Sequence, residues 1–262
     1  MSWNREGFLE SLPEEEKIFA AQIFDKINQV EKTKQPLVLD FLDPAKNGLI
    51  NEIVKNFVGI NCSFYGGYGQ AERKRPVLIP DFYPRELIDA KLKAIEVRGN
   101  FSFRPVSHRD FLGAVLGLGI KREKIGDIIL TDNGCQIITT EEIGEFLLFH
   151  LKKVGRVSVE VREIDLEQLE VKPESVKEIK TTVASLRLDA VASAGFSTSR
   201  TKMVEQIKGE KVKVNWKTVI NPSFQLKEGD VLSVRGRGRV VLEAVLGETK
   251  KGRKSVLLKR YV

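Results

Sequence analysis

Apolar and polar positions divide the first 85 residues into helical and extended stretches. Residues 13–32 carry apolar side chains at the spacing of one helix face: Phe19, Ile23, Ile27 and Val30. Residues 43–57 predict a second helix, with Asp43 as its N-cap. Residues 62–82 predict two strands, joined by a loop that contains the polar run ERKR at 72–75. We therefore expect an N-terminal α/β domain over residues 1–85.

The stretch from 86 to 165 alternates strand-like and helix-like patterns. Ser107 and Thr140 stand where N-caps of two helices are expected. The predicted order is strand 94–99, helix 107–120, strand 125–130, strand 135–140, helix 141–151 and strand 156–164. This βαββαβ order is that of the ferredoxin-like fold, which RNA-recognition motifs (RRMs) share. The predicted first and third strands contain no aromatic residue for base stacking. We therefore expect an RRM-like shape with a positional or partner-docking role.

The remaining residues predict a linker and a third domain. Residues 166–182 are charged and polar and include Pro173, so we interpret them as a linker with at most one short helix. Residues 183–262 predict two short helices followed by β-hairpins. The chain as a whole is predicted to be a multidomain α+β protein.

The start of the second helix in this third domain carries hydroxyls and cations together. Gly195 is placed to end the first helix in a left-handed conformation, and Ser197 to cap the second. Arg200 and Lys202 then bring positive charge to a helix start, which opposes the helix dipole by up to ~1 kcal/mol. An arriving anion would meet free N–H groups, hydroxyls and cations, the local chemistry of a phosphate site. The alternative is that both cations are solvated surface charges.

Charge is distributed unevenly along the 262 residues. From Arg187 onward there are 17 Lys and Arg against 7 Asp and Glu, whereas the first 186 residues contain 26 basic and 29 acidic residues. This segregation is typical of a polyanion-binding module joined to a neutral body. No apolar stretch is long enough to span a bilayer and no lipidation motif is present, so we expect nucleic acid and no membrane. The run at 72–75 is then either a solvated turn or an accessory RNA contact.

Cysteine and histidine usage narrows the chemistry. Cys62 and Cys135 lie far apart in the sequence, and the chain has only two histidines and no CxxC motif. This usage is typical of reduced thiols in the cytoplasm, and it disfavours a structural zinc site.

At the residue level, the stretch 187–234 resembles the S4 RNA-binding domain. The matching positions are Arg187-Leu188-Asp189, Gly195, Ser199-Arg200, Ile207, Gly209, Val212, Val214-Asn215 and Gly229-Asp230. S4 domains bind structured RNA through their two-helix face and the turn into the first strand. The resemblance implies RNA contact at Arg187, Ser197, Ser199, Arg200, Lys202, Lys208, Lys211 and Asn215.

Four further candidates come from charge and aromaticity alone. Lys217, Arg235 and Arg237 add positive charge to the same segment. Trp216 follows Asn215 in an expected tight turn, where it either stacks on a nucleotide, at ~1–3 kcal/mol per base, or packs on its own domain.

Taken end to end, the chain resembles the YlmH family of bacterial S4 proteins. The stretches that carry this resemblance are VLIPDFYP (77–84), HRDFLGAVLGLGIKREKIGDI (108–128) and VRGRGRV (234–240). The resemblance implies RNA partners, namely rRNA of the large ribosomal subunit and peptidyl-tRNA, in the rescue of stalled translation. It also implies a link to cell division. We expect a cytoplasmic monomer.

The main alternative is an RNA-modifying enzyme that uses its S4 domain for targeting. The HIGH and KMSKS signatures of tyrosyl-tRNA synthetases are absent, and GGYG (66–69) and GRG (236–238) match a Gly-rich cofactor loop only weakly. Only residues 248–262 follow the hairpins, where pseudouridine synthases carry a catalytic domain. We therefore expect no catalytic residue, cofactor or metal. A third hypothesis is a protein scaffold for division, built on the first two domains.

Overall fold

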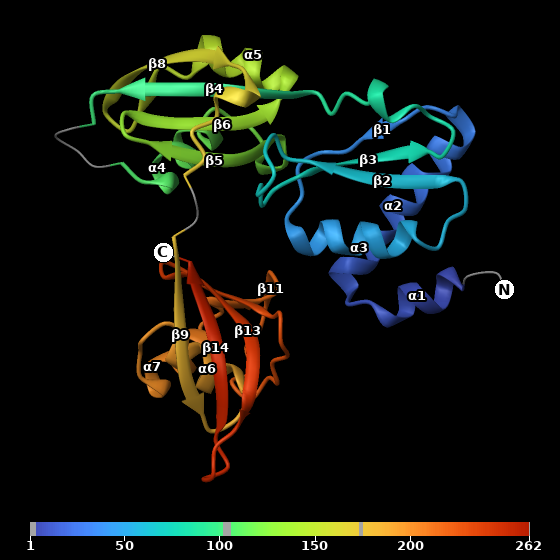
Figure 1. Ribbon diagram of the computed structural model, residues 1–262. Helices are drawn as coiled ribbons and strands as arrows, with labels where there is room; N and C mark the ends of the chain where they lie inside the picture. Colours follow the sequence, from blue (N-terminus) through green and yellow to red (C-terminus); the bar gives the residue numbers. More distant parts are fainter. Residues whose placement is uncertain (1–3, 102–105, 173–174, 262) are drawn as a thin grey trace. The chain divides into compact units, whose positions relative to one another are not determined.

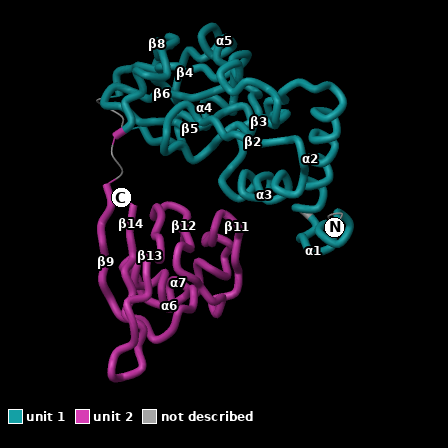
Figure 2. Tube along the Cα trace, turned by 45° about the vertical axis from the view of Figure 1, so that its right-hand side comes forward, with its two compact units in different colours: residues 1–171 teal, residues 172–262 magenta. Residues whose placement is uncertain are grey.

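The computed structural model describes residues 4–101, 106–172 and 175–261. The chain forms two compact units, Met1–Val171 and Lys172–Val262, which are coloured separately in Figure 2. The fold is multidomain α+β, in agreement with the prediction from sequence. Within the described ranges, no helix has the length and apolar character that crossing a bilayer requires.

The first part of unit 1 is a small sheet covered by helices. Its helices are α1 (Arg5–Ser11), α2 (Glu14–Thr33) and α3 (Pro44–Val54), and its strands are β1 (Leu37–Val38), β2 (Ile60–Tyr65) and β3 (Arg75–Pro80), paired in the antiparallel order β1-β3-β2. Ile23, Ile27 and Val30 of α2 are buried against α3 and the sheet, as their spacing predicts. Asp43 caps α3 by accepting a hydrogen bond from the Lys46 N–H. The sequence patterns did not reveal α1.

The ERKR run is not a solvated turn. Arg75 is buried, and its guanidinium donates to the carbonyls of Leu39, Ala90 and Lys91 at 2.7–2.8 Å. Arg73 donates to the carbonyls of Phe41 and Ile125 at 2.8 and 3.1 Å. These two arginines join backbone segments inside unit 1, so the run contributes to packing rather than to a free basic loop.

The second part of unit 1 has the predicted topology. Its strands are β4 (Leu92–Gly99), β5 (Ile125–Thr131), β6 (Gly134–Thr140), β7 (Lys153–Val154) and β8 (Val157–Ile164); its helices are α4 (His108–Leu116) and α5 (Glu141–His150), with short 3-10 turns η1 (Arg85–Leu87), η2 (Arg122–Lys124) and η3 (Leu166–Gln168). The sheet order β5-β6-β4-β8-β7, antiparallel throughout, is the ferredoxin-like arrangement with one short added strand (Figure 1). The βαββαβ prediction is confirmed.

The two predicted helix caps in this part differ. Ser107 forms a capping box, in which its backbone N–H and hydroxyl donate to Asp110 at 2.9 and 2.6 Å. Thr140 stands at the N-cap position of α5, but its side chain makes no capping bond and its hydroxyl is buried without a hydrogen-bond partner. The pattern therefore located both helix starts, but of the two expected caps only Ser107 makes a side-chain bond there.

On the sheet face opposite α4 and α5, residues 168–170 cover part of β6. In β6, Cys135 and Ile137 point to the helices, so Gln136 between them points to the opposite face. It is nevertheless only 1% exposed. Its side chain donates to the carbonyl of Gln168 and accepts from the N–H of Glu170. This cover occupies the surface on which RRMs stack bases, in keeping with strands that carry no aromatic residue there.

Asp127 of β5 ties the two parts of unit 1 together. Its carboxylate accepts from the Tyr68 hydroxyl at 2.8 Å and from the N–H groups of Glu72 and Arg73 at 2.7 and 3.0 Å. The segments expected as two separate domains thus pack into one unit.

Unit 2 is a six-stranded sheet with two helices on one face. Its elements are β9 (Val176–Val183), α6 (Leu188–Gly195), α7 (Arg200–Lys208), β10 (Val212–Val214), β11 (Lys217–Thr218), β12 (Val231–Val234), β13 (Gly238–Glu248) and β14 (Lys254–Tyr261). The strand order is β11-β10-β12-β13-β14-β9. Apolar side chains of both helices pack with those of the strands in a single core.

Strand β9 corrects the expected linker at 166–182. It pairs antiparallel with β14 over eight residues, from Val176 opposite Tyr261 to Val183 opposite Lys254. Only every second side chain of its C-terminal half is covered, and its exposed positions are mostly charged, as is usual for an edge strand. A charged, mostly exposed segment of this kind has the composition of a linker. Only its pairing with β14 identifies it as a strand. Residues 173 and 174 of the expected linker lie outside the described residues.

Candidate nucleic-acid interface

The two helices of unit 2 are held by a continuous apolar stripe. Leu188 and Val191 of α6, Phe196 in the turn, and Met203 and Ile207 of α7 are all at most 2% exposed. Because these residues face the sheet, the cations of α7, Arg200, Lys202 and Lys208, lie toward solvent. This packing presents the hydroxyls and cations singled out in the sequence.

The N-cap of helix α7 lies two residues later than predicted, at Ser199 and not at Ser197. Ser199 is its N-cap, and its hydroxyl accepts from the Lys202 N–H at 3.3 Å. Ser197 is not the cap: it lies in the preceding turn with φ of 50°, the left-handed conformation expected for Gly195.

The role of Gly195 is packing. It ends α6 without a positive φ, and a Cβ placed there would lie 2.7 Å from Cγ1 of Val240 on β13. The glycine therefore lets the end of α6 approach the sheet closely.

Two of the predicted RNA-contact residues meet at one buried carboxylate. Asp189 has a side chain 3% exposed, and it accepts from Arg187 at 3.2 Å and from Arg200 at 2.9 Å. Burial alone would raise the pKa of Asp189, but the hydrogen bonds and charges of the two arginines outweigh it, so the pKa lies below its ordinary value. The arginine side chains remain 36% and 49% exposed. Their guanidiniums are thus oriented by Asp189 while still reachable from solvent.

The role of Asp189 was missed in the sequence analysis. It is the sole acidic residue between Arg187 and Lys202, and it stands in the apolar run LDAVA. A lone carboxylate on a buried helix face requires a charged partner, and the two flanking arginines were the candidates.

Asn215 and Trp216 form the expected tight turn. Both have positive φ, 48° and 65°, and they join β10 to β11 as a two-residue loop of the kind that matches strand twist. The Asn215 amide donates to Asp230 at 2.8 Å and accepts from the Val231 N–H at 2.9 Å. Asn215 therefore holds the turn against the loop before β12. Trp216 is half-buried, and Lys217 is exposed.

The other predicted cations fall into separate places around the sheet edge and helices. Lys202 and Lys208 are exposed on α7. Lys211 and Arg235 lie side by side, because the Arg235 N–H donates to the Lys211 carbonyl at 2.9 Å. Arg237 donates to the Phe196 carbonyl at 3.4 Å, which places it at the α6–α7 turn.

Apart from Lys208 and the pair Lys211 and Arg235, these residues make two groups. The helix start, the Asp189 network and Arg237 adjoin one another through the α6–α7 turn. Asn215, Trp216 and Lys217 lie at the other end of β10 from Lys211.

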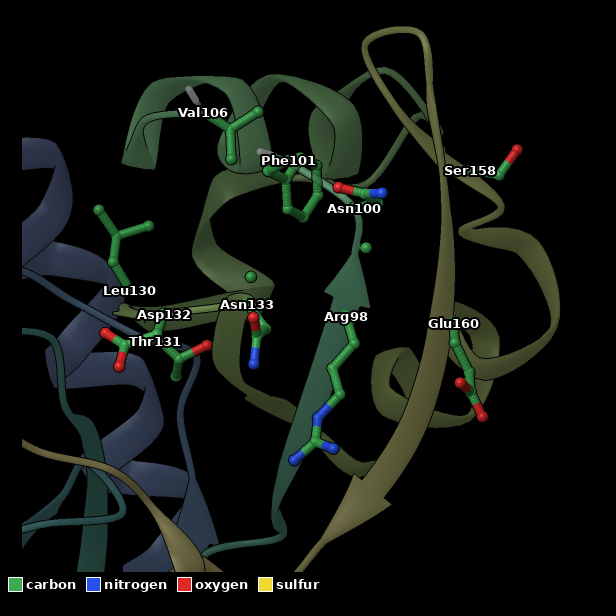
Figure 3. A pocket seen from close by; sticks show the side chains of 12 residues that line it. Arg98, Asn100, Phe101, Val106, Leu130, Thr131, Asp132, Asn133, Ser158 and Glu160 are labelled. Carbon is green, nitrogen blue, oxygen red and sulfur yellow. The ribbon is translucent and has the colours of Figure 1, made fainter. Parts of the chain in front are cut away.

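A different cavity, of about 900 Å³, lies in unit 1 at the ends of β4 and β8 (Figure 3). Arg98 on β4 and Asn133 of the β5–β6 turn flank it, with Glu160 on β8. Its charged lining combines one cation, Arg98, with the carboxylates Asp132 and Glu160. This lining lacks the excess of positive charge that an RNA backbone requires.

Neither cysteine is set up as a nucleophile. Burial raises the pKa of Cys62 to about 12, and it raises that of Cys135 further. Both thiols are free. Among the described residues, no group of three His, Cys, Asp or Glu side chains is arranged to hold a metal ion.

Known families match the chain in three consecutive segments. The family described as "YlmH, N-terminal" matches residues 15–81, "Putative RNA-binding domain in YlmH" matches 86–168, and "S4 domain" matches 186–232.

Individual proteins are similar over different lengths. The ribosome-associated protein quality control protein P2 of Bacillus subtilis (strain 168) is 37% identical over 246 residues, which cover 94% of this chain and 95% of that protein. The small ribosomal subunit protein uS4 of Desulfotalea psychrophila is 44% identical over 54 residues, 20% of this chain and 26% of that protein.

A solved structure is also similar. The cell division protein ylmH from Streptococcus pneumoniae superposes with a TM-score of 0.52 at 27% identity, covering 61% of this chain and 97% of that one. The full-length similarity to the Bacillus subtilis protein and the three consecutive matches confirm the resemblance stated from sequence: the chain belongs to the YlmH family of S4-domain proteins.

Proposed function

We propose that this protein binds structured RNA of the large ribosomal subunit and peptidyl-tRNA through unit 2, and acts in the quality control of stalled translation. The observation that carries the proposal is the pair of solvent-reachable arginines, Arg187 and Arg200, oriented by one buried carboxylate on an S4 helix pair. Arginines held in place lose less conformational entropy when they bind a phosphate, so this geometry favours binding of an RNA backbone.

Relatives supply the biological context. The Bacillus subtilis relative, which matches over nearly the whole chain, is named a ribosome-associated protein quality control protein. The Desulfotalea psychrophila relative, which matches over 54 residues, is a ribosomal protein. By this analogy, we place the protein in the cytoplasm as a monomeric binding protein without catalysis. The name of the Streptococcus pneumoniae structure adds cell division to this proposal as a setting for the same RNA-binding activity.

The twelve predicted site residues do not all have the same part in the proposal. Lys202, Lys208, Lys211, Lys217 and Arg235 are exposed and suit direct phosphate contact. Arg187, Arg200 and Arg237 combine contact with structural bonds, whereas Asn215, Ser197 and Ser199 mainly shape the turns that hold the others. Trp216 is the candidate for stacking.

The test must avoid Arg200, because a glutamate there would face the buried carboxylate of Asp189 and destabilise the fold. We therefore choose the double variant Lys202→Glu, Lys208→Glu, both on the exposed face of α7. Two charge reversals should lower affinity by about 100-fold at 150 mM salt, because phosphate contacts are replaced by repulsion. Co-sedimentation of the full chain with purified large ribosomal subunits measures this loss.

The matched control reverses the charge of two exposed lysines of unit 1, in the double variant Lys32→Glu, Lys55→Glu. This control has the same net charge as the test variant and should sediment with the subunits as the unaltered chain does. Equal sedimentation of the α7 variant and the unaltered chain would contradict the proposed interface.

A further inference from the structure

A recess in unit 2 adjoins Arg200 and is completed by segments outside the S4 match. It has a volume of about 340 Å³, and the polar part of its lining consists of Thr182, Ser193, Thr198, Arg200 and Arg253. Thr182 belongs to β9, and Arg253 to the turn between β13 and β14. The S4 match covers residues 186–232 only. The recess therefore depends on a strand and a hairpin that this chain adds to the S4 helices.

Arg253 is fixed at the rim of the recess by Thr182. Its Nε donates to the Thr182 hydroxyl at 3.2 Å, and its Nη2 donates to the Thr182 carbonyl at 2.7 Å. The Thr182 hydroxyl accepts in this pair, so its own proton can be donated to another acceptor. Since Arg253 is an exposed residue, its anchored guanidinium can also contact a ligand from solvent.

Arg200 supplies a second oriented guanidinium to the same recess. It is held by Asp189 at 2.9 Å and is 49% exposed. Ser193 donates its hydroxyl proton to the Ala190 carbonyl at 2.9 Å. It therefore lines the recess without a proton to donate to a ligand. The donors available to a ligand are thus two arginines with the hydroxyls of Thr182 and Thr198.

The chemistry of this lining selects an anion. No acidic side chain stands among the described residues that line the recess. Planar guanidiniums with hydroxyl donors match the oxygens of a phosphodiester, which arginine binds through paired hydrogen bonds. We propose that the recess binds a phosphodiester group of the RNA backbone, as an extension of the S4 interface beyond the helix pair. This inference rests on the proposed function, because Arg200 is shared by both sites.

A backbone contact positions RNA without selecting sequence. Loss of Arg253 should therefore weaken binding to different RNAs by a similar factor. It should also lower the slope of log affinity against log salt by about 1, the value for one phosphate contact.

The experiment compares full-length Arg253→Gln with Lys251→Gln, which removes an equal charge from the same turn at an exposed residue outside the recess. Binding to purified large ribosomal subunits and to a 24-nucleotide RNA hairpin is measured by fluorescence anisotropy over a salt series. We expect Arg253→Gln to weaken both interactions by about 10-fold, the lower end of the range for a lost hydrogen bond to a charged group, because the site is partly exposed. Lys251→Gln should change them less than about 2-fold, with an unchanged salt slope.

A second variant distinguishes loss of RNA binding from loss of the bonds that hold the recess together. Thr198→Glu leaves the bonds between Arg253 and Thr182 in place and puts a carboxylate into the recess, so it should weaken binding at least as much as Arg253→Gln. If both recess variants match Lys251→Gln while the unaltered chain binds, the inference is wrong and the proposed function stands. If the unaltered chain binds neither RNA, the proposed function fails, and this inference fails with it.

Discussion

At the scale of single residues, Asp189 organises the candidate interface of unit 2 by binding two arginines. Its residue type and its two arginines are plain in the sequence, but only the fold brings Arg187 and Arg200 to the same carboxylate. Asp189 lies on α6 and Arg200 at the start of α7, so the network depends on how the two helices pack. This is why the cations were predicted as phosphate contacts alone, without their structural role.

Asp189→Asn should destabilise α6 at neutral pH by about 1–2 kcal/mol, because it weakens two charged hydrogen bonds to a buried group. The pKa of Asp189 is lowered in the folded state. Its contribution is therefore fully present above the pKa of an unfolded aspartate and is lost as the pH falls through the lowered folded value. Hydrogen–deuterium exchange of peptides from α6 should show faster exchange in the variant at pH 7.

The difference between variant and unaltered chain should shrink as the pH drops below 4. Asp25→Asn, which neutralises an exposed carboxylate on α2, is the control and should leave exchange in α6 unchanged. A difference that grows toward low pH would contradict the assignment.

At the scale of elements, the ferredoxin-like part was predictable and strand β9 was not. The strands and helices of the former alternate clearly, and TDNG at 131–134 marks the turn between β5 and β6. Edge strand β9 has charged residues at most exposed positions and few buried ones, so no local pattern separates it from a linker. Its partner β14 lies more than 70 residues away in the sequence, which places this pairing beyond any local pattern.

Two helical glycines give a test of packing at this scale. Gly113 of α4 is exposed, and a Cβ there would meet nothing within 4 Å, whereas at Gly195 it would crowd buried Val240. Gly113→Ala should therefore stabilise unit 1 by about 0.5–1 kcal/mol through helix propensity. Gly195→Ala should destabilise unit 2 by about 1–3 kcal/mol through overpacking.

Thermal unfolding, monitored through the NMR signals of each unit separately, gives the change in stability of unit 1 and of unit 2. Both substitutions add the same methyl group, so opposite changes in the free energy of unfolding would reflect the different surroundings of the two glycines. A stabilising effect of Gly195→Ala would show that α6 does not press against β13 as closely as described.

At the scale of the whole molecule, the two units have separate cores. The core of unit 2 draws its buried residues from 183 to 258, and those of unit 1 come from 20 to 154. The excess positive charge lies in the unit that carries the candidate interface, and the neutral charge balance lies in the other. Charge segregation in the sequence thus corresponds to a structural division.

A fragment of residues 172–262 should therefore fold without the rest of the chain. Its backbone amide NMR signals are expected to coincide with those of unit 2 in the full protein, except near the cut. A fragment of residues 184–262, which lacks β9, exposes the edge of β14 and should show weaker protection of β14 amides from exchange. Loss of folded signals from the longer fragment would show that unit 2 depends on unit 1.

The pairing of β9 with β14 also sets an order of events during synthesis. The first strand of unit 2 has its hydrogen-bonding partner in residues 254–261, so the sheet cannot be completed until those residues have left the ribosomal exit tunnel. The rim formed by Thr182 and Arg253 is likewise assembled only then. A nascent chain that halts before residue 254 therefore lacks this part of the proposed RNA-binding surface.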